Sequence, residues 1–136
     1  MQKKEQGALG ETLARDFLES KGYLFIEANF VRRVGEIDLI MLAPEDEQLG
    51  RIIVFVEVRY RATSRYGGAL ASVDWKKQRK LVRTASAWLQ RNADSRDCAR
   101  IDIIAIEPLG RTPYKDECVW KNHHLLWLSN AIESAT

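Results

Sequence analysis

The sequence predicts a mixed α/β fold in which helices cover a mixed β-sheet. Segments 7–22 and 75–91 carry apolar side chains at the three-and-four spacing of an amphipathic helix. Runs rich in Val, Ile, Leu and Phe, which suit strands, lie between the two helices and after the second one. A helix between two consecutive strands is a crossover, and a crossover joins parallel strands. The third and fourth strands are therefore expected to pair in parallel.

The first half of the chain predicts one helix and an antiparallel meander. Leu13, Phe17 and Leu18 lie on one stripe of the first helix, and Gly22 is a natural residue for its C-terminal end. Short connections between consecutive strands favour antiparallel pairing. The strands are expected at 23–30, 35–42 and 52–61, with a basic turn at 31–35 and a polar connection at 44–50.

The second half predicts the crossover helix and the far part of the sheet. Residues 62–72 are loop-like, and Ser72 or Asp74 is a suitable N-cap for the helix at 75–91. The stripe that includes Leu81, Ala85 and Trp88 faces the sheet. The remaining elements are expected to be a strand at 99–107, a short strand at 118–122 and a short C-terminal helix at 125–132.

Length and composition predict a single soluble domain over residues 1–136. With 46% hydrophobic and 29% charged residues, the chain can form a core and keep a polar surface. The formal net charge of +2 is small, so any nucleic-acid surface must be a local basic patch. The chain has no signal-peptide h-region and no membrane-length apolar run. Together with the isolated Cys98 and Cys118, these features favour a cytoplasmic protein.

Three charged residues interrupt otherwise apolar strands. Glu57 and Arg59 project from one face of their strand, and Asp38 lies in the preceding strand. A carboxylate among Val and Phe is costly unless a cation or hydrogen-bond donors meet it. If Asp38 and Glu57 converge, their oxygens and a nearby backbone carbonyl form a site suited to Mg²⁺ or Mn²⁺. The alternative is an Asp38–Arg59 ion pair, with Glu57 bonded to Lys77 or a backbone donor.

The order of these residues resembles the PD-(D/E)XK nuclease pattern: Asp38, then Glu57-Val-Arg59, after a helix that carries Glu11. The chain also resembles the YraN-like family of uncharacterised bacterial proteins, which is similar to archaeal Holliday-junction resolvases. The segments that carry this resemblance are 7–11, 17–23, 35–40, 55–59, 72–77 and 101–105, of which Gly-Glu-Ile-Asp-Leu-Ile and Phe-Val-Glu-Val-Arg are the most specific together.

The resemblance implies a restriction endonuclease-like core, with a helix, three strands, a helix and a strand. It implies an Mg- or Mn-dependent endonuclease that hydrolyses phosphodiesters of DNA, including branched DNA, and acts as a homodimer. Asp38 and Glu57 would be the metal ligands, and Glu11, otherwise an ordinary solvated helix residue, would be an accessory acid. Arg59 replaces the signature lysine, and an arginine cannot serve as a base because it stays protonated. Gln78 is a further candidate from the second helix.

Basic residues near this constellation suggest a surface for the phosphates of DNA, although a solvated helix face has the same pattern. The alternative functions are a non-catalytic nucleic-acid-binding module on a nuclease scaffold and a protein-interaction domain. The basic residues are Arg32, Arg33, Arg61, Arg65, Lys76, Lys77, Arg79 and Lys80.

Aromatic residues and histidines are expected to have mainly structural roles. Tyr60 and Tyr66 either stack on a base or pack on the sheet, and packing is favoured. The four tryptophans are expected to pack in the core or at its edges, with one in a dimer contact as an open alternative. His123 and His124 point apart in an extended segment, so they would not chelate one ion and are expected on the polar surface.

Overall fold

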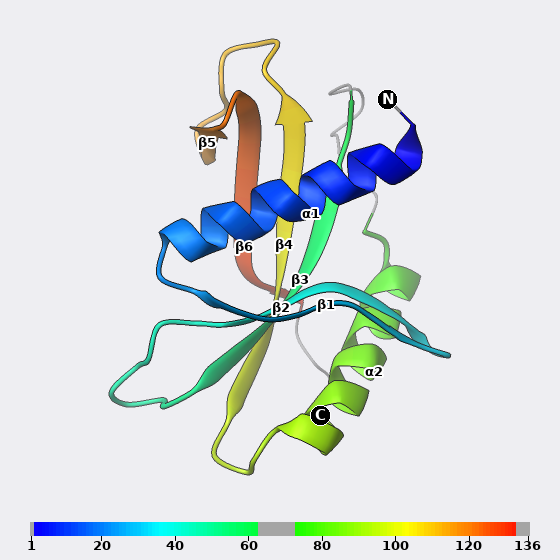
Figure 1. Ribbon diagram of the computed structural model, residues 1–136, viewed down its shortest axis with the longest axis vertical. Coiled ribbons are helices and arrows are strands. Elements are labelled where there is room, and N and C mark those ends of the chain that lie inside the picture. Colours follow the sequence, from blue (N-terminus) through cyan, green and yellow to red (C-terminus); the bar gives the residue numbers. More distant parts are fainter. Residues whose placement is uncertain (1, 63–72, 133–136) are drawn as a thin grey trace.

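The computed structural model describes residues 2–62 and 73–132, and within them a six-stranded mixed sheet has one helix against each face (Figure 1). The element order confirms the predicted α/β class. Neither helix in these described ranges is long and apolar enough to cross a membrane. The elements are α1 (Lys3–Ser20), β1 (Leu24–Arg32), β2 (Gly35–Leu42), β3 (Ile52–Tyr60), α2 (Trp75–Asn92), β4 (Cys98–Pro108), β5 (Glu117–Trp120) and β6 (His123–Ile132).

The strand order across the sheet is β1-β2-β3-β4-β6-β5. β1, β2 and β3 form the expected antiparallel meander. The α2 crossover leads to parallel pairing of β3 with β4, from Ile52 beside Cys98 to Tyr60 beside Ile106. The crossover prediction is therefore confirmed, and β3 lies inside the sheet with a neighbour on each side.

The helix ends are set by local chemistry. After α1, Gly22 adopts a φ of +90°, and its N–H donates to the Glu19 carbonyl. Asp74 is the N-cap of α2, and its side chain accepts a hydrogen bond from Lys77 N–H at 2.9 Å. Asp74 is therefore the residue that fills the predicted N-cap position.

The predicted C-terminal helix at 125–132 is wrong, because this segment lies in strand β6. β6 sits between β4 and β5 and pairs with both, so neighbouring strands satisfy its backbone groups. The internal position also buries His124, which was expected on the surface. The short strand ends at Trp120 rather than at Asn122, because Lys121 and Asn122 form a turn with positive φ values of 45° and 63°.

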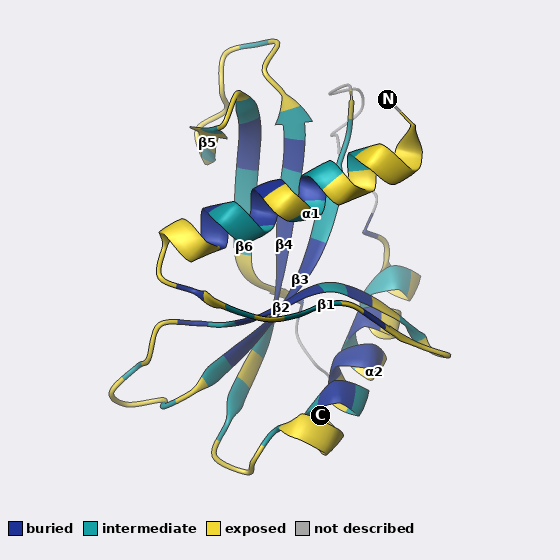
Figure 2. Cartoon of the chain, in the orientation of Figure 1, coloured by how far each residue is buried: buried dark blue, intermediate teal, exposed yellow. Residues whose placement is uncertain are grey.

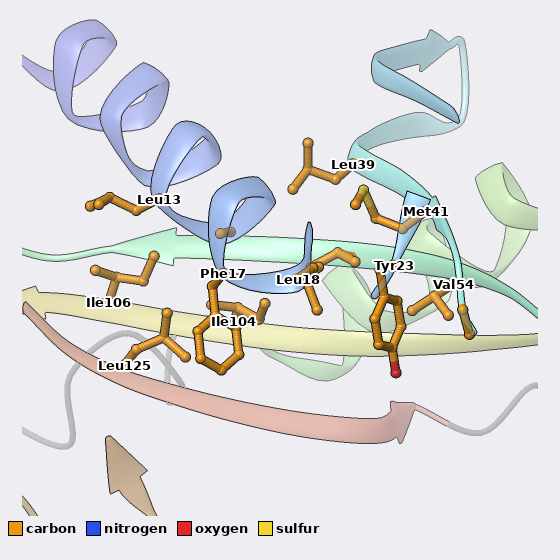
Figure 3. Packing of buried hydrophobic residues seen from close by; sticks show 13 residues of the cluster. Leu13, Phe17, Leu18, Tyr23, Leu39, Met41, Val54, Ile104, Ile106 and Leu125 are labelled. Atoms are coloured by element: carbon orange, nitrogen blue, oxygen red, sulfur yellow. The ribbon is translucent and has the colours of Figure 1, made fainter. Parts of the chain in front are cut away.

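The face of the sheet that α1 covers has an apolar core. Leu13, Phe17 and Leu18 of α1 pack over Val54 of β3 and Ile104 of β4 (Figure 3). The buried stripe of α1 faces the sheet, while its outer side is exposed (Figure 2). Burial of these side chains holds α1 across the middle of the sheet, since each contributes about 1.5–3 kcal/mol.

Gly10 allows α1 to approach β3 closely. A Cβ atom at Gly10 would lie 3.1 Å from Tyr60 Cβ and 3.3 Å from Val58 Cγ1. The packing of Tyr60 into the core on this side confirms the favoured prediction for that residue. The close approach also sets the position of Glu11, the next residue of α1, relative to the end of β3.

A second core lies between α2 and the other face of the sheet. Trp88 packs edge-to-face against Phe55 of β3, with ring centroids 5.7 Å apart. The turn between β1 and β2 also touches α2, because a Cβ at Gly35 would lie 2.8 Å from Thr84 Oγ1 and 3.3 Å from Lys80 Cβ. The core and this turn contact fix the position of α2 over β2 and β3.

Asp102 on β4 is a buried carboxylate that joins two strands. Its Oδ1 atom accepts hydrogen bonds from Arg100 Nε at 3.0 Å and from Asn130 N–H at 2.8 Å. Its Oδ2 atom accepts a hydrogen bond from Trp127 Nε1 at 2.9 Å. The carboxylate therefore satisfies donors of both β4 and β6 in a place that water does not reach.

Replacement of Asp102 by Ala is expected to lower the free energy of unfolding by roughly 3 kcal/mol, because it leaves the Arg100 charge and two further donors without their partner. Urea denaturation at pH 7 measures this loss. Asp16→Ala is the control, since Asp16 forms an exposed pair with Lys121 at 2.9 Å and its loss should cost less than about 1 kcal/mol. Equal losses in both variants would contradict the structural role of Asp102.

Candidate functional site

The candidate site lies where β2 and β3 separate. Their paired register runs from Leu42 beside Ile53 to Leu39 beside Val56. Asp38, the next residue on β2, accepts a hydrogen bond from Val58 N–H of β3 through its Oδ2 atom at 2.8 Å. The carboxylate thus takes the place of a strand carbonyl at the fork between the two strands. A carboxylate at this point is explained by the backbone donor that it satisfies.

Glu57 of β3 lies at the same fork and is only 3% exposed. Burial, followed by its hydrogen bond with Asp38 and the Asp38 charge, raises the pKa of Glu57 to about 8. The cationic charges of Lys77 and Arg59 oppose this increase. Asp38 and Glu57 therefore converge, as the sequence analysis required, and they repel each other when both are ionised.

Two cations approach the buried carboxylate of Glu57. Its Oε2 atom lies 3.3 Å from Lys77 Nζ and 3.7 Å from Arg59 NH2, but it makes no hydrogen bond. Of the alternative ion-pair arrangement, the Glu57–Lys77 contact is present, whereas Asp38 and Arg59 form no ion pair in the described structure. Asp38 instead accepts a hydrogen bond from the Val58 backbone, and Arg59 lies with Glu57 on the face of β3 opposite Val58 and Tyr60.

Glu11 approaches Asp38 from α1, which covers the other face of the sheet from α2. Its Oε2 atom accepts a hydrogen bond from Asn29 Nδ2 at 3.2 Å. Partial burial raises the pKa of Glu11, and this hydrogen bond opposes the increase. The charges of Asp38 and Glu36 add to the increase. Glu11 is therefore an electrostatic neighbour of Asp38, although its hydrogen-bond partner is Asn29.

The acids fit a divalent cation that keeps most of its water. Within the described ranges, no three His, Cys, Asp or Glu side chains form a group that could hold a metal together. Asp38 and Glu57 supply a pair of carboxylates, and the Glu57 Oε2 atom has an unused hydrogen-bonding capacity. Mg²⁺ typically uses one or two carboxylates together with waters and substrate phosphate. The two carboxylates therefore match the usual binding mode of Mg²⁺ and do not match a site in which protein groups supply every ligand.

Gln78 does not join these acids. Its side-chain Nε2 atom donates to the Val73 carbonyl at 3.2 Å, at the start of α2. This hydrogen bond holds the amide at the start of α2. The expectation that Gln78 reaches the site is therefore not met in this structure.

Basic residues from the β1–β2 turn and from α2 form one neighbourhood beside the acids. The contact of Gly35 with Lys80 brings the turn next to the helix. Arg61 follows at the end of β3 and is half-buried. Arg65 and Tyr66 fall outside the described residues. The exposed members of this basic surface are Arg32, Arg33, Lys76, Arg79 and Lys80, and Lys77 is half-buried next to Glu57.

The exposure of Trp75 differs from the packing expected for the four tryptophans. The side chain is 65% exposed at the first residue of α2, whereas Trp88 on the same helix is in the core. Thirteen residues separate them, which places Trp75 about 140° around the helix from Trp88. Helical phase could have revealed this difference, but tryptophan as a residue type suggests burial.

Comparison with known proteins decides the family. The sequence profile described as "Uncharacterised protein family UPF0102" matches residues 10–106 of the chain. The chain belongs to the UPF0102 family. The matched range contains all five charged residues of the candidate site, which are Glu11, Asp38, Glu57, Arg59 and Lys77.

Individual members of the UPF0102 family confirm the predicted YraN-like resemblance. The chain is 50% identical over 105 residues to the UPF0102 protein YraN of Escherichia coli, covering 75% of each protein. It is 49% identical over 113 residues to a UPF0102 protein of Haemophilus influenzae, covering 82% of this chain and 87% of the relative. A UPF0102 protein of Mannheimia succiniciproducens is 42% identical over 134 residues, covering 96% and 97%.

Replacement of Glu57 by Gln is expected to stabilise the protein at alkaline pH. The folded-state pKa of about 8 lies above the ordinary value of 4.5, so ionisation costs folded-state stability increasingly as pH rises between these values. The variant should melt higher than the parent at pH 9, by roughly 3–5 °C for each kcal/mol relieved, and similarly to it at pH 4.5.

The groups that face Glu57 are Asp38 on β2, Arg59 on β3 and Lys77 on α2, and they remain in place in this variant. Glu45→Gln, at an exposed position, is the matched control and should show no such pH-dependent difference. A Glu57→Gln variant that melts lower than the parent at pH 9 would contradict the burial penalty assigned to this carboxylate.

Proposed function

We propose that this UPF0102 protein is a metal-dependent endonuclease that hydrolyses DNA phosphodiesters. The observation that carries the proposal is the meeting of Asp38 and Glu57 at the fork, where the Glu57 Oε2 atom makes no hydrogen bond and faces two cations. The names of the relatives state no activity, so the support comes from this geometry and from the resemblance to PD-(D/E)XK nucleases.

In the proposed site, Asp38 and Glu57 would hold Mg²⁺ or Mn²⁺, and Glu11 would act on Asp38 electrostatically from α1. Such a bound ion lowers the pKa of its water and offsets charge on the phosphodiester. The hydrogen bond from Val58 N–H fixes the Asp38 carboxylate through its Oδ2 atom. The fork thus supplies a rigid pair of ligands on two neighbouring strands.

Lys77 takes over the task of the signature lysine in this proposal. Arg59 cannot release a proton, but its guanidinium can hold phosphate oxygens. Lys77 brings an ammonium group to 3.3 Å from Glu57 from a different element, α2. The two cations have different roles. Arg59 binds the scissile phosphate, and Lys77 orients the attacking water and stabilises the developing charge.

The basic surface supplies affinity for the DNA backbone. Exposed Arg and Lys side chains on the β1–β2 turn and on α2 border the acidic fork. Such contacts bind phosphates independently of base sequence, and they weaken as salt rises. Cleavage of two strands of a branched DNA requires two such sites, so a branched substrate implies a homodimer.

One observation favours the alternative of a non-catalytic nucleic-acid-binding module. Lys77 and Arg59 already surround the Glu57 carboxylate and can balance its charge without a metal. In that case the fork is a structural ion-pair cluster, and the basic surface alone acts. Metal-induced stabilisation and cleavage distinguish the two functions.

The nuclease proposal predicts Mg²⁺- or Mn²⁺-dependent cutting of linear or branched DNA. Asp38→Asn and Glu57→Gln are expected to reduce the cleavage rate by roughly 100-fold or more, because each removes a charged ligand. The metal should also raise the melting temperature of the parent, by the equivalent of about 2.7 kcal/mol at 100 times its Kd, and should have little effect on either variant.

Asp16→Asn is the control, since it removes an acid of α1 that pairs with Lys121 and takes no part in the fork. It should keep both cleavage and metal stabilisation. Undiminished cutting in Asp38→Asn or Glu57→Gln would exclude the assigned site. Salt-sensitive DNA binding without metal stabilisation or cutting would support the non-catalytic module.

The role proposed for Lys77 predicts that its substitution affects cleavage, whereas substitution of the neighbouring Lys76 affects DNA binding. Lys77→Met should lower the single-turnover cleavage rate by roughly 10–1000-fold with little change in DNA affinity. Lys76→Met, on the exposed side of the same turn, should weaken binding and reduce the slope of log K against log salt by about 1. Similar effects of both substitutions would contradict a special role of Lys77.

A further inference from the structure

We propose that Trp75 is a stacking platform for an unpaired base, so that the protein selects nucleic acid with single-stranded segments next to the cleavage site. This inference rests on the proposed function for the presence of a nucleic acid at the site. It adds a substrate class and a specificity-determining residue, and it depends on the exposure of one indole ring and on its neighbours.

The indole of Trp75 is large, apolar and 65% exposed at the first residue of α2. The guanidinium carbon of Arg79 lies 4.8 Å from the centre of the Trp75 ring. A cation over the ring restrains the orientation of the indole. The high exposure leaves ring surface available to a ligand, and restraint by Arg79 lowers the entropy lost on binding.

The charge around Trp75 indicates what kind of ligand fits. Lys76, Arg79 and Lys80 are all exposed on the first turns of the same helix. An apolar protein surface would have to bury or displace these cations, at a cost in desolvation. A nucleic-acid strand satisfies both features, because its phosphates pair with the cations and its bases stack on the indole.

The position of Trp75 connects the platform to the acidic fork. Lys77 follows Trp75 by two residues, about 3 Å along the helix axis, and its Nζ atom lies 3.3 Å from Glu57 Oε2. Two residues also turn the helix by about 200°, so the Trp75 and Lys77 side chains leave nearly opposite sides of the same helix end. A base on Trp75 therefore belongs to a nucleotide that neighbours the proposed scissile phosphate, on a strand that passes around the first turn of α2.

The stacking mode excludes an interior base pair of a duplex. In an intact duplex, the faces of each base are covered by the adjacent base pairs, so an aromatic side chain stacks only on unpaired or splayed bases. The substrate class is therefore a strand with unpaired bases, such as a gap, a flap or a single-stranded tail, rather than fully paired DNA.

The test compares Trp75→Ala with the parent in binding assays that contain EDTA, so that cleavage does not enter the result. One probe is a fluorescein-labelled duplex, and the other is the same duplex with a single-stranded tail. Anisotropy titration should show that Trp75→Ala weakens binding to the tailed probe by about tenfold and to the paired duplex by less than twofold. Trp75→Phe, which keeps an aromatic face, should restore most of the difference.

The outcomes separate this inference from the proposed function. Equal loss on both probes, or no loss on the tailed probe, would overturn the role of Trp75. Failure of the parent to bind either probe would overturn both proposals. A selective loss on the tailed probe would support the stacking platform even if a parallel assay with Mg²⁺ or Mn²⁺ showed no cleavage. Circular dichroism of the variants confirms that they are folded.

Discussion

The hydrogen bond from Val58 N–H to the Asp38 carboxylate is the interaction on which the rest of the candidate site depends. It lies where the β2–β3 register ends, and there β2 separates from β3 while it stays paired with β1 and β3 continues beside β4. The resulting fork brings Asp38 next to Glu57. Without a side-chain acceptor at this point, the separation of the strands would leave a buried donor unpaired, at a cost of about 1–3 kcal/mol.

Each face of the sheet contributes a different kind of group to the fork. On one side, the close packing of Gly10 against β3 brings Glu11 near Asp38. On the other side, the core around Trp88 and Phe55 holds α2 so that Lys77 reaches Glu57. The same hydrophobic contacts that stabilise the domain therefore set an acid on one side and a cation on the other.

The electrostatics of the fork show that Glu57 is not placed there for stability alone. Burial and the neighbouring Asp38 favour the protonated form of Glu57, while Lys77 and Arg59 favour the ionised form. Opposed influences of this kind are typical of functional sites, although structural ion-pair networks also show them. In this UPF0102 protein, the fork is therefore the place at which a function can be tested by substitution.

The sequence by itself determined the α/β class, the crossover, the meander and the candidate acids, because hydrophobic periodicity and charges inside apolar strands are local signals. Only the tertiary structure decided that Glu57 pairs with Lys77 and Arg59 while Asp38 bonds to backbone. It also decided that 125–132 is a strand, that His124 is buried and that Trp75 is exposed. These outcomes depend on which elements become neighbours in space, and strand β6 owes its state to pairing with β4 and β5 rather than to its own residues.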